Sequence, residues 1–415
     1  MKIVLISAWF FPEQTGGTEI YVLELARGLK AMGHEVLVAV PHAGTDGRDD
    51  VWEDVPIHRY PDAATAPNPS MSINHLELWI RREHPDLVHF HSWTLDAGLP
   101  QWQRIGDAGY PLVLTPHIAA MFCARGTMWR WGSVPCDGEL LPARCAACYF
   151  QKRGLPASLG MPIAALAHDN PSWAKMAAGK FRTLLEYPSV LQDRKRELAS
   201  VWGGARKIIA VSHWMRDALI RNGCASHKVA LVRQGASLPP SRATARVKSE
   251  TRFGFLGRQD ADKGLDLLLE AFRRLPKDKP VTLEIATVGS SPAVTTDDDR
   301  IHYHTLPDRQ VVSDWMRSLD ALVVPSRTME TGPLVVYEAL ASGIPVVGAA
   351  HGGISELVQD GVNGRLFKPH SSEDLEKTLR SIVEHPETLP KVDSAGARTM
   401  RDVAREMESL YREIS

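Results

Sequence analysis

The sequence predicts an α/β protein built from two doubly wound, Rossmann-like domains with parallel sheets. Short apolar, β-branched runs alternate with segments of helical periodicity along the chain, which is the pattern of parallel sheets with crossover helices. The length of 415 residues suits two domains, and an apolar content of 44% is sufficient for two cores. Two wound sheets joined by one linker are expected to leave a deep cleft, where ligands commonly bind.

The first domain is expected over residues 1–235. Its first strand leads into a loop that ends in Gly16-Gly17, and a helix is predicted over residues 18–32. The segment of about residues 118–200 is interpreted as a cysteine-rich insertion. Buried strands are predicted at residues 2–7, 35–40, 87–91, 112–116 and 207–211.

The second domain is expected over residues 236–397. The join is placed in residues 234–248, because Pro239-Pro240 and the loss of periodicity indicate a linker. Helices are predicted at residues 265–275 and 333–341, and an amphipathic helix closes the chain at residues 399–414. Strands are predicted at residues 251–256, 282–288, 302–305, 321–325 and 345–348.

Charge and hydropathy exclude several classes of protein. A net charge of −1 does not suggest a strongly basic nucleic-acid binder. No apolar run approaches the length of a membrane span, and residues 1–7 are too short for a signal peptide. We therefore expect a cytoplasmic protein, which argues against structural disulfides among the five cysteines.

Two glutamates, Glu330 and Glu338, lie on either side of a predicted strand-to-helix turn. Glu330 precedes the helix, and Glu338 follows about one and a half turns later. In a parallel sheet this turn lies at the carboxyl edge, where ligands bind. Two carboxylates directed at one polyhydroxylated ligand would suit a sugar ring and a ribose, whereas the alternative is a loop charge beside a solvated helix position.

A second candidate site follows the strand at residues 251–256. Arg258 and Lys263 are five residues apart and directly precede a predicted helix. A guanidinium and an ammonium beside a helix N-terminus favour an anion, and a diphosphate is the expected one. The alternative is a solvated loop that contains two ordinary cations.

The pattern from residue 325 to 348, followed by Gly352-Gly353, closely resembles the Glu-x7-Glu donor motif of retaining GT-B glycosyltransferases of family 4. Residues 257–264 resemble the Gly-Arg…Lys-Gly element of the same family. The resemblance covers nearly the whole chain except residues 118–200. It implies the GT-B fold, a nucleotide diphosphate sugar donor, chemistry that requires no cofactor, and a closing helix at residues 398–415 that crosses back to the first domain.

The resemblance also implies roles for individual residues. His117 ends a predicted strand and matches the family's histidine near the donor sugar, although a lone histidine is as often structural. Two departures concern Thr331-Gly332-Pro333, which replaces a common aromatic position, and Gln234-Gly-Ala-Ser237, where many members have Asn-Gly and an acidic residue. The implied catalytic residues are His117, Arg258, Lys263 and Glu330, and the implied donor-binding residues are Gly16, Gly17, Gly257, Thr331, Gly332, Pro333, Leu334 and Glu338.

Other nucleotide or metal sites fit the sequence less well. A dinucleotide-binding dehydrogenase would need Gly-x-Gly-x-x-Gly after a strand, which the Gly16-Gly17 loop does not provide. Asp297-Asp-Asp299 could suggest a metal-dependent transferase, but it lies in a Thr/Asp-rich turn and is interpreted as solvated. His89 and His91 are interpreted as packing or cleft-lining residues.

Four cysteines fall within 26 residues of the insertion, at Cys123, Cys136, Cys145 and Cys148. The Cys-Ala-Ala-Cys spacing is typical of zinc ligands, and four thiolates would complete a tetrahedral structural zinc site. Free thiols and a redox or iron–sulfur role remain alternatives. Interleaved cations and tryptophans around the cluster suit an acceptor glycan, an anionic membrane surface bearing a lipid-linked acceptor, or a solvated surface.

These observations predict a retaining glycosyltransferase that moves a sugar from a nucleotide diphosphate sugar to a glycan, glycolipid or small-molecule hydroxyl in polysaccharide or glycoconjugate biosynthesis. Peripheral contact with the inner face of the membrane is a further hypothesis, and no nucleic-acid partner is expected. A nucleotide-sugar epimerase or hydrolase of the same fold is the second hypothesis. The third is a non-catalytic carbohydrate- or nucleotide-binding partner. The nucleotide base, the sugar and the acceptor stay open.

Overall fold

The computed structural model describes residues 1–65, 68–176, 178–237, 250–287, 297–306 and 309–415. These residues form two compact units. The first unit comprises residues 1–14, 26–232 and 407–415, and the second comprises residues 15–25 and 233–406. Most of the expected linker, residues 238–248, and Val288 of a predicted strand lie outside the described residues.

The first unit contains an eight-stranded sheet in the order β10-β9-β6-β5-β1-β2-β4-β3. Every pairing in it is parallel except that of the edge strand β3 with β4. The five predicted strands are present, and β3, β4 and β10 were not predicted. The strands are β1 (Lys2–Ile6), β2 (Glu35–His42), β3 (Arg48–Trp52), β4 (Val55–Pro61), β5 (Leu87–Phe90), β6 (Leu112–Leu114), β9 (Lys207–Ala210) and β10 (Val229–Leu231).

Strand β4 was missed because its charged residues suggest an exposed segment. Arg59 is nevertheless buried, with an exposed fraction of 2%. Its guanidinium donates a hydrogen bond to Asp50 of β3 at 2.6 Å, and His58 contacts Asp49 at the same distance. Buried charges are tolerated when they are paired. The carboxylates of β3 are therefore the partners that allow the polar side chains of β4 to be buried.

Helices cover this sheet and fill one apolar core. Helix α1 (Gly17–Ala31) was predicted over nearly the same residues. Helices α2 (Pro69–Glu83), α3 (Leu99–Asp107) and α8 (His213–Arg221) contribute residues to that core.

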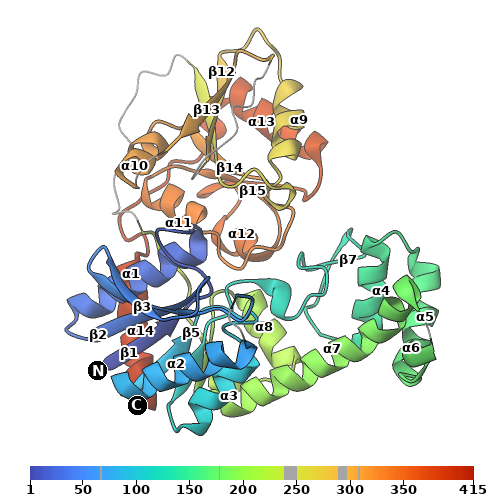
Figure 1. Cartoon of the computed structure of the whole chain (residues 1–415). Coiled ribbons are helices and arrows are strands. Elements are labelled where there is room, and N and C mark those ends of the chain that lie inside the picture. Colours follow the sequence, from blue (N-terminus) through green and yellow to red (C-terminus); the bar gives the residue numbers. More distant parts are fainter. Residues whose placement is uncertain (66–67, 177, 238–249, 288–296, 307–308) are drawn as a thin grey trace. The chain divides into compact units, whose positions relative to one another are not determined.

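The connection from β6 to β9 contains a group of helices, drawn in green in Figure 1. Helices α4, α5 and α6 contact the long helix α7, and they lie at the end of α7 that is remote from the sheet (Figure 1). We name residues 142–204 the helical lobe. It comprises α4 (Pro142–Lys152), α5 (Ala157–Asp169), α6 (Trp173–Met176) and α7 (Gly179–Gly204), and it follows the short strands β7 (Trp129–Arg130) and β8 (Val134–Pro135).

The second unit contains a six-stranded sheet in the order β13-β12-β11-β14-β15-β16, with every pairing parallel. Strand β11 lies between β12 and β14, so the chain leaves β11 toward one side and returns on the other. This is a topological switch point, at which ligands bind outside the carboxyl ends of the strands. The strands are β11 (Thr251–Leu256), β12 (Val281–Thr287), β13 (Ile301–Thr305), β14 (Ala321–Val324), β15 (Val346–Ala349) and β16 (Gly364–Phe367).

The helices of this unit include α9 after β11 and α11 after β14, as the sequence predicts. The apolar residues of the strands and helices form cores on the two faces of the sheet. The predicted α/β class with parallel sheets is therefore confirmed. The helices are α9 (Leu265–Arg273), α10 (Arg309–Arg317), α11 (Leu334–Ala341), α12 (Gly352–Leu357) and α13 (Ser372–Glu384).

The closing helix α14 (Met400–Ile414) buries the apolar face that its sequence predicts, including Met400, Val403, Met407 and Tyr411. Its residues 407–415 group with the first unit. There the Tyr411 hydroxyl lies 2.5 Å from His89 Nδ1. In the part of the chain that the structure describes, no helix is long and apolar enough to cross a bilayer.

Candidate active site

The loop that follows β11 packs directly on the end of β14. Gly264 has a φ of +72°, and a Cβ at this position would lie 2.1 Å from the Pro325 carbonyl oxygen. Only glycine permits this approach without displacing the backbone. Lys263, which precedes Gly264, ends a short 3₁₀ turn that the Asp260 side chain caps. The contact therefore directs Lys263 toward the loop after β14.

Glu330, in that loop, receives the ammonium group of Lys263. Lys263 Nζ donates a hydrogen bond to Glu330 Oε1 at 2.7 Å, and the Ser326 hydroxyl donates to the same oxygen at 2.9 Å. The Glu330 side chain is 16% exposed. Burial alone would raise the pKa of Glu330, but the charge and hydrogen bonds of Lys263 and Ser326 outweigh it and lower that pKa. The structure thus brings the predicted Lys263 and Glu330 together as an ion pair.

The glycine pair at the start of α12 allows the Glu330 loop to adopt this position. A Cβ on Gly352, whose φ is +54°, would lie 2.9 Å from the Glu330 carbonyl oxygen. A Cβ on Gly353 would lie 2.8 Å from the carbonyl oxygen of Thr331. The Gly353 amide also donates to the Glu330 carbonyl at 2.6 Å. The two glycines therefore let the start of α12 pack closely against the backbone that carries Glu330.

Sequence reasoning gave no role to two residues beside Glu330. Ser326 donates to its carboxylate, and His351 Nε2 lies 2.8 Å from the Ser326 carbonyl oxygen. Burial lowers the pKa of His351 although this hydrogen bond opposes the shift. Their positions give a weak signal, because Ser326 lies inside the quoted motif and His351 directly precedes the glycine pair.

Arg258 is mostly exposed and forms an ion pair with Asp260 at 3.0 Å. Its charge also acts on Glu19, near the start of α1. Glu19 is buried, and burial raises the pKa of its carboxyl although backbone hydrogen bonds and Arg258 oppose the rise. A Cβ on Gly16 would lie 2.6 Å from Glu19 Oε2, so glycine makes room for this carboxyl. Glu19 is a third residue to which sequence reasoning gave no role.

The remaining predicted donor-binding residues lie around the same two loops. Thr331 is buried, and Pro333 is the residue that caps α11. Gly17 approaches Leu334 in the first turn of α11, since a Cβ on Gly17 would lie 3.8 Å from Leu334 Cδ1. The Gly257 amide donates to Ala286 at 3.2 Å. Gly332 lies in the turn between Thr331 and Pro333.

Glu338, in α11, takes part in a separate polar network. The Ser237 hydroxyl donates to its carboxylate, and Arg309 donates to the Ser237 carbonyl at 2.7 Å. Arg309 also forms an ion pair with Glu24 of α1. Glu338 is 7% exposed, and burial raises its pKa although Ser237 and Arg309 oppose the shift. Its side chain therefore contacts Ser237 rather than the Lys263–Glu330 pair.

His117 lies in the first unit, beyond the end of β6. Its Nε2 lies 3.2 Å from Nδ1 of His91, while His89 Nε2 lies 2.8 Å from the Thr115 hydroxyl. Burial lowers the pKa of His117 to about 3 and the pKa values of His89 and His91 well below their ordinary value. His117 is therefore a neutral ring that His91 contacts directly. His89 and His91 pack inside the unit.

Two family models match the chain in the regions that carry these residues. The model for glycosyl transferases group 1 matches residues 241–399, which include Lys263, Glu330 and Glu338. The model for glycosyltransferase family 4 matches residues 15–134, which include Gly16, Gly17 and His117. The chain belongs to the group 1 glycosyltransferases.

Curated relatives of this glycosyltransferase agree with that assignment. A D-inositol 3-phosphate glycosyltransferase of Streptomyces coelicolor is 24% identical over 92% of this chain and 82% of its own length. A protein of the same name from Xylanimonas cellulosilytica is 36% identical over 32% of this chain and 36% of its own length.

Solved structures show the same fold. The Anabaena protein HepE, in complex with UDP and glucose, has a TM-score of 0.64 and 16% identity, with all of both chains covered. Sucrose-phosphate synthase from Thermosynechococcus elongatus has a TM-score of 0.68 and 19% identity, covering 99% of this chain and 98% of its own. At these identities the likeness shows the fold alone, which is that of a GT-B glycosyltransferase.

The structure gives no support to the zinc site predicted for the cysteine segment of this glycosyltransferase. Among the described residues no group of three or more His, Cys, Asp or Glu side chains is placed to hold a metal ion. The four cysteines line one small cavity, and all are free. Burial raises the pKa of Cys145 to about 11 despite the nearby Arg144. The proximity that the Cys-Ala-Ala-Cys spacing predicted is present.

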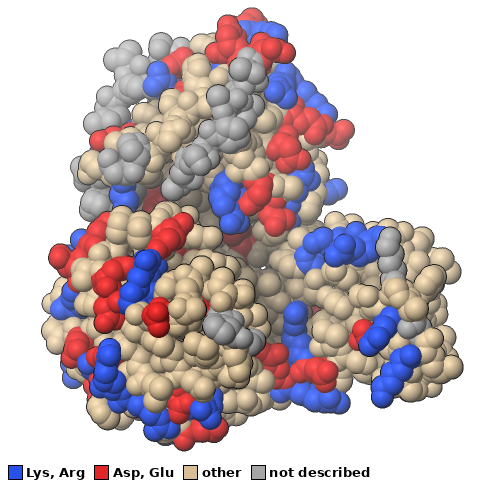
Figure 2. Space-filling model, viewed as in Figure 1, with Lys and Arg blue, Asp and Glu red and all other residues tan. Residues whose placement is uncertain are grey.

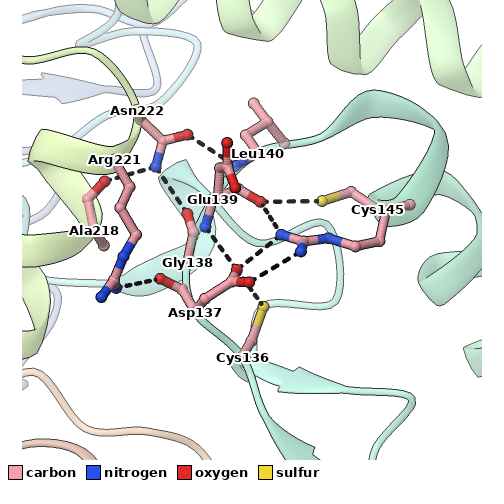
Figure 3. Close-up of polar contacts among 10 residues, drawn as sticks. Cys136, Asp137, Gly138, Glu139, Leu140, Cys145, Ala218, Arg221 and Asn222 are labelled. Atoms are coloured by element: carbon pink, nitrogen blue, oxygen red, sulfur yellow. Dashed lines mark hydrogen bonds and ion pairs between the residues drawn. The ribbon is translucent and has the colours of Figure 1, made fainter.

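Arg144 and Asp137 form an ion pair between Cys136 and Cys145 instead (Figure 3). The Arg144 guanidinium donates to both carboxylate oxygens of Asp137, at 2.8 and 2.9 Å. The Cys136 and Cys145 sulfurs make only long contacts of 3.8 Å, to Asp137 and to the Glu139 carbonyl. A bidentate ion pair is thus the main polar interaction at this part of the cysteine segment.

The same segment is attached to α8 by Asn222 (Figure 3). The Asn222 amide group donates to the carbonyls of Gly138 and Ala218, and its side-chain oxygen accepts from the Leu140 amide at 2.9 Å. The neighbouring Arg221 donates to the Asp137 carbonyl at 2.8 Å. One buried side chain therefore satisfies two backbone groups of an irregular region and one carbonyl of α8.

Proposed function

We propose that this glycosyltransferase moves a sugar from a nucleotide diphosphate sugar to a hydroxyl acceptor with retention of anomeric configuration. The observation that carries the proposal is the Lys263–Glu330 ion pair at the switch point of the second sheet. A HepE structure with UDP and glucose, and another with UDP-glucose, support a donor of this class.

The charges suit cleavage of the bond between the sugar and the diphosphate. Negative charge then develops on the leaving group and positive charge on the sugar ring. Arg258, Lys263 and the backbone amides at the start of α11 would stabilise the diphosphate, without a metal ion. Glu330 would orient the sugar hydroxyls beside the ring, and the departing phosphate would assist removal of the acceptor proton.

Donor binding would exchange the partners of two carboxylates. The diphosphate would take the Lys263 ammonium from Glu330 Oε1, where it donates at 2.7 Å. A ribose hydroxyl would replace the Ser237 hydroxyl on Glu338. Both carboxylates already accept hydrogen bonds from the protein before the donor binds. Each exchange therefore replaces one hydrogen bond with another.

The acceptor is proposed to be a hydroxyl of a glycan, a glycolipid or a small molecule, in polysaccharide or glycoconjugate biosynthesis. The names of the curated relatives make a phosphorylated cyclic polyol a specific candidate. His117, neutral and held by His91, would contact the donor sugar near the reacting carbon.

A panel of UDP- and GDP-sugars, read as donor-dependent thermal stabilisation, tests the donor. A ligand at a hundred times its Kd should stabilise the protein by about 2.7 kcal/mol. The stabilising donor is then incubated with inositol phosphate and with glycan acceptors, and the anomeric configuration of the product is read by NMR. An inverted product would overturn the proposed stereochemistry.

The same experiment separates the two alternatives. Sugar release or a changed sugar in the absence of any acceptor would identify a hydrolase or an epimerase. Donor binding without turnover under every condition would identify a non-catalytic binding partner.

A further inference from the structure

The helical lobe exposes an unusual number of large apolar side chains. The described residues include 18 large hydrophobic side chains that are exposed, and seven of them lie between residues 159 and 190. Met176 is 87% exposed and Phe181 is 74% exposed. The seven are Leu159, Met161, Leu166, Trp173, Met176, Phe181 and Val190. Scattered exposed apolar residues are ordinary, whereas a concentration of them indicates an interaction surface.

Helix α5 shows how this surface arises. Its small residues Gly160, Ala164 and Ala167 are buried, and Gly160 lies against Ala147 of α4. Leu159 and Leu166, seven residues apart, share one face of the helix, and both are exposed. The helix therefore turns small side chains toward the protein and large apolar ones toward the solvent.

The remaining apolar side chains lie on elements that adjoin α5. Helices α5 and α6 both contact α7, at its end remote from the sheet (Figure 1). Trp173 and Met176 belong to α6, and Phe181 to the first turn of α7. The outer end of the helical lobe is therefore apolar over three consecutive helices.

Positive charge accompanies this surface. Residues 142–182 contain six Lys or Arg and a single acidic residue, Asp169, although Arg182 pairs with Glu186 one turn further along α7. Lys152, Arg153, Lys175 and Arg182 are exposed, and Figure 2 shows Lys and Arg over the visible face of the lobe with little Asp or Glu. Apolar side chains flanked by cations match the boundary of an anionic bilayer, where acyl chains adjoin phosphate groups.

We propose that α5, α6 and the first turns of α7 dock on an anionic lipid bilayer. The aromatic rings of Trp173 and Phe181 enter the headgroup region, and Lys175 contacts lipid phosphates. Arg182 does so by exchanging Glu186 for a phosphate. Docking is peripheral. It goes beyond glycosyl transfer, because lipid binding requires neither donor nor acceptor.

Co-sedimentation of the full chain with vesicles tests the docking. Vesicles of phosphatidylcholine with about a third phosphatidylglycerol should bind the protein about tenfold more strongly than vesicles of phosphatidylcholine alone. High salt should weaken binding to the anionic vesicles, because it screens the cations. The absence of binding, or equal binding to both kinds of vesicle, would overturn the proposal.

Matched variants locate the surface. Leu166→Ser with Met176→Ser and Phe181→Ser should reduce vesicle binding at least about tenfold, without lowering the thermal midpoint, because all three side chains are exposed. The control is Leu78→Ser with Leu95→Ser, two equally exposed leucines elsewhere in the first unit. Equal loss in both sets, or loss in neither, would overturn the assignment to the lobe.

A charge variant and an oligomer measurement complete the test. Lys175→Glu with Arg182→Glu should abolish the preference for anionic vesicles. Sedimentation without lipid asks whether the surface pairs with a second copy of the chain. A dimer that only the triple variant disrupts would overturn lipid docking. Sugar transfer to a soluble acceptor, measured without vesicles, should be the same in all these variants, so failure of docking is distinguishable from failure of the transferase assignment.

Discussion

The loops of the second sheet and the helical lobe differ in whether the protein itself provides contacts for their side chains. In the second unit, Gly264, Gly352 and Gly353 bring backbone within contact distance of the Glu330 loop, and the polar groups there are paired. In the lobe, by contrast, large apolar side chains point into solvent. The donor loops are organised by the protein alone, whereas the lobe presents a surface that a partner has to complete. The following predictions test that contrast, from the largest expected effect to the smallest.

Glu330→Gln should lower kcat by about 10²–10³-fold, because the lost charge stabilises the sugar ring only as positive charge develops. Binding of the nucleoside diphosphate should change little, since the amide can still accept from Ser326. Steady-state kinetics and calorimetry measure the two quantities. A turnover close to that of the unaltered enzyme at saturating donor would refute the role of Glu330.

A comparison of Gly352→Ala with Gly361→Ala distinguishes the strain of a positive φ from the steric contact of a new Cβ with neighbouring backbone. Both glycines have a positive φ, but a Cβ on Gly352 would meet the Glu330 backbone at 2.9 Å, whereas one on Gly361 would meet nothing within 4 Å. Each variant should lose about 1 kcal/mol of stability. Only Gly352→Ala should also lower kcat, by about 10–100-fold, because it displaces Glu330. Equal activity of the two variants would count against this account of the loop.

Asn222→Ala should destabilise the first unit by about 2–3 kcal/mol, because it leaves buried backbone groups without their hydrogen bonds. Arg221→Gln is the control. It removes one exposed hydrogen bond and should change the free energy of unfolding by less than about 1 kcal/mol. Chemical denaturation measures both, and similar losses would show that Asn222 does not anchor the cysteine segment.

The three buried histidines should make the first unit sensitive to acid. The folded-state pKa of His117 is about 3, well below its ordinary value of 6.5. Protonation therefore favours the unfolded state, so stability is fully present above about pH 6.5 and declines as the pH falls toward 3. Each neutral histidine adds up to about 1.4 kcal/mol per pH unit to that slope. Thermal midpoints across pH 4–8 should fall less steeply for His117→Gln, and an unchanged slope would contradict a neutral His117.

The smallest expected effect is that of a chelator. Brief EDTA treatment should leave transfer unchanged, because Arg258 and Lys263 can neutralise the diphosphate. Activity that EDTA abolishes and Mg²⁺ or Mn²⁺ restores would refute this mechanism. Elemental analysis of the same sample also measures zinc, and a stoichiometric content would restore the four-thiolate hypothesis for the cysteine segment.

Sequence reasoning reached the fold because strand and helix periods alternate so regularly. Strands β11 and β14 were predicted to within one residue. It missed β4, since Arg59 and His58 suggest an exposed segment until their partners Asp50 and Asp49 are known. Local patterns predict elements, whereas the burial of a charge depends on a neighbouring strand.

The candidate site was predictable in its residues but less so in its contacts. Lys263 and Glu330 were assigned to separate motifs 67 residues apart, and they meet because β11 and β14 are neighbours in the sheet. Glu19 and His351 carry no local signal of comparable strength, because their surroundings come from other loops.

The connection between β6 and β9 also has an evolutionary consequence. These strands are parallel neighbours, and such a pair requires a crossover of only a dozen or so residues. The C-terminal part of α7, which leads into β9, can serve that purpose. The rest of the lobe is then a cassette that recombination could lengthen, replace or remove without rebuilding the sheet. Related enzymes could in this way change where they act in the cell while keeping the chemistry they perform.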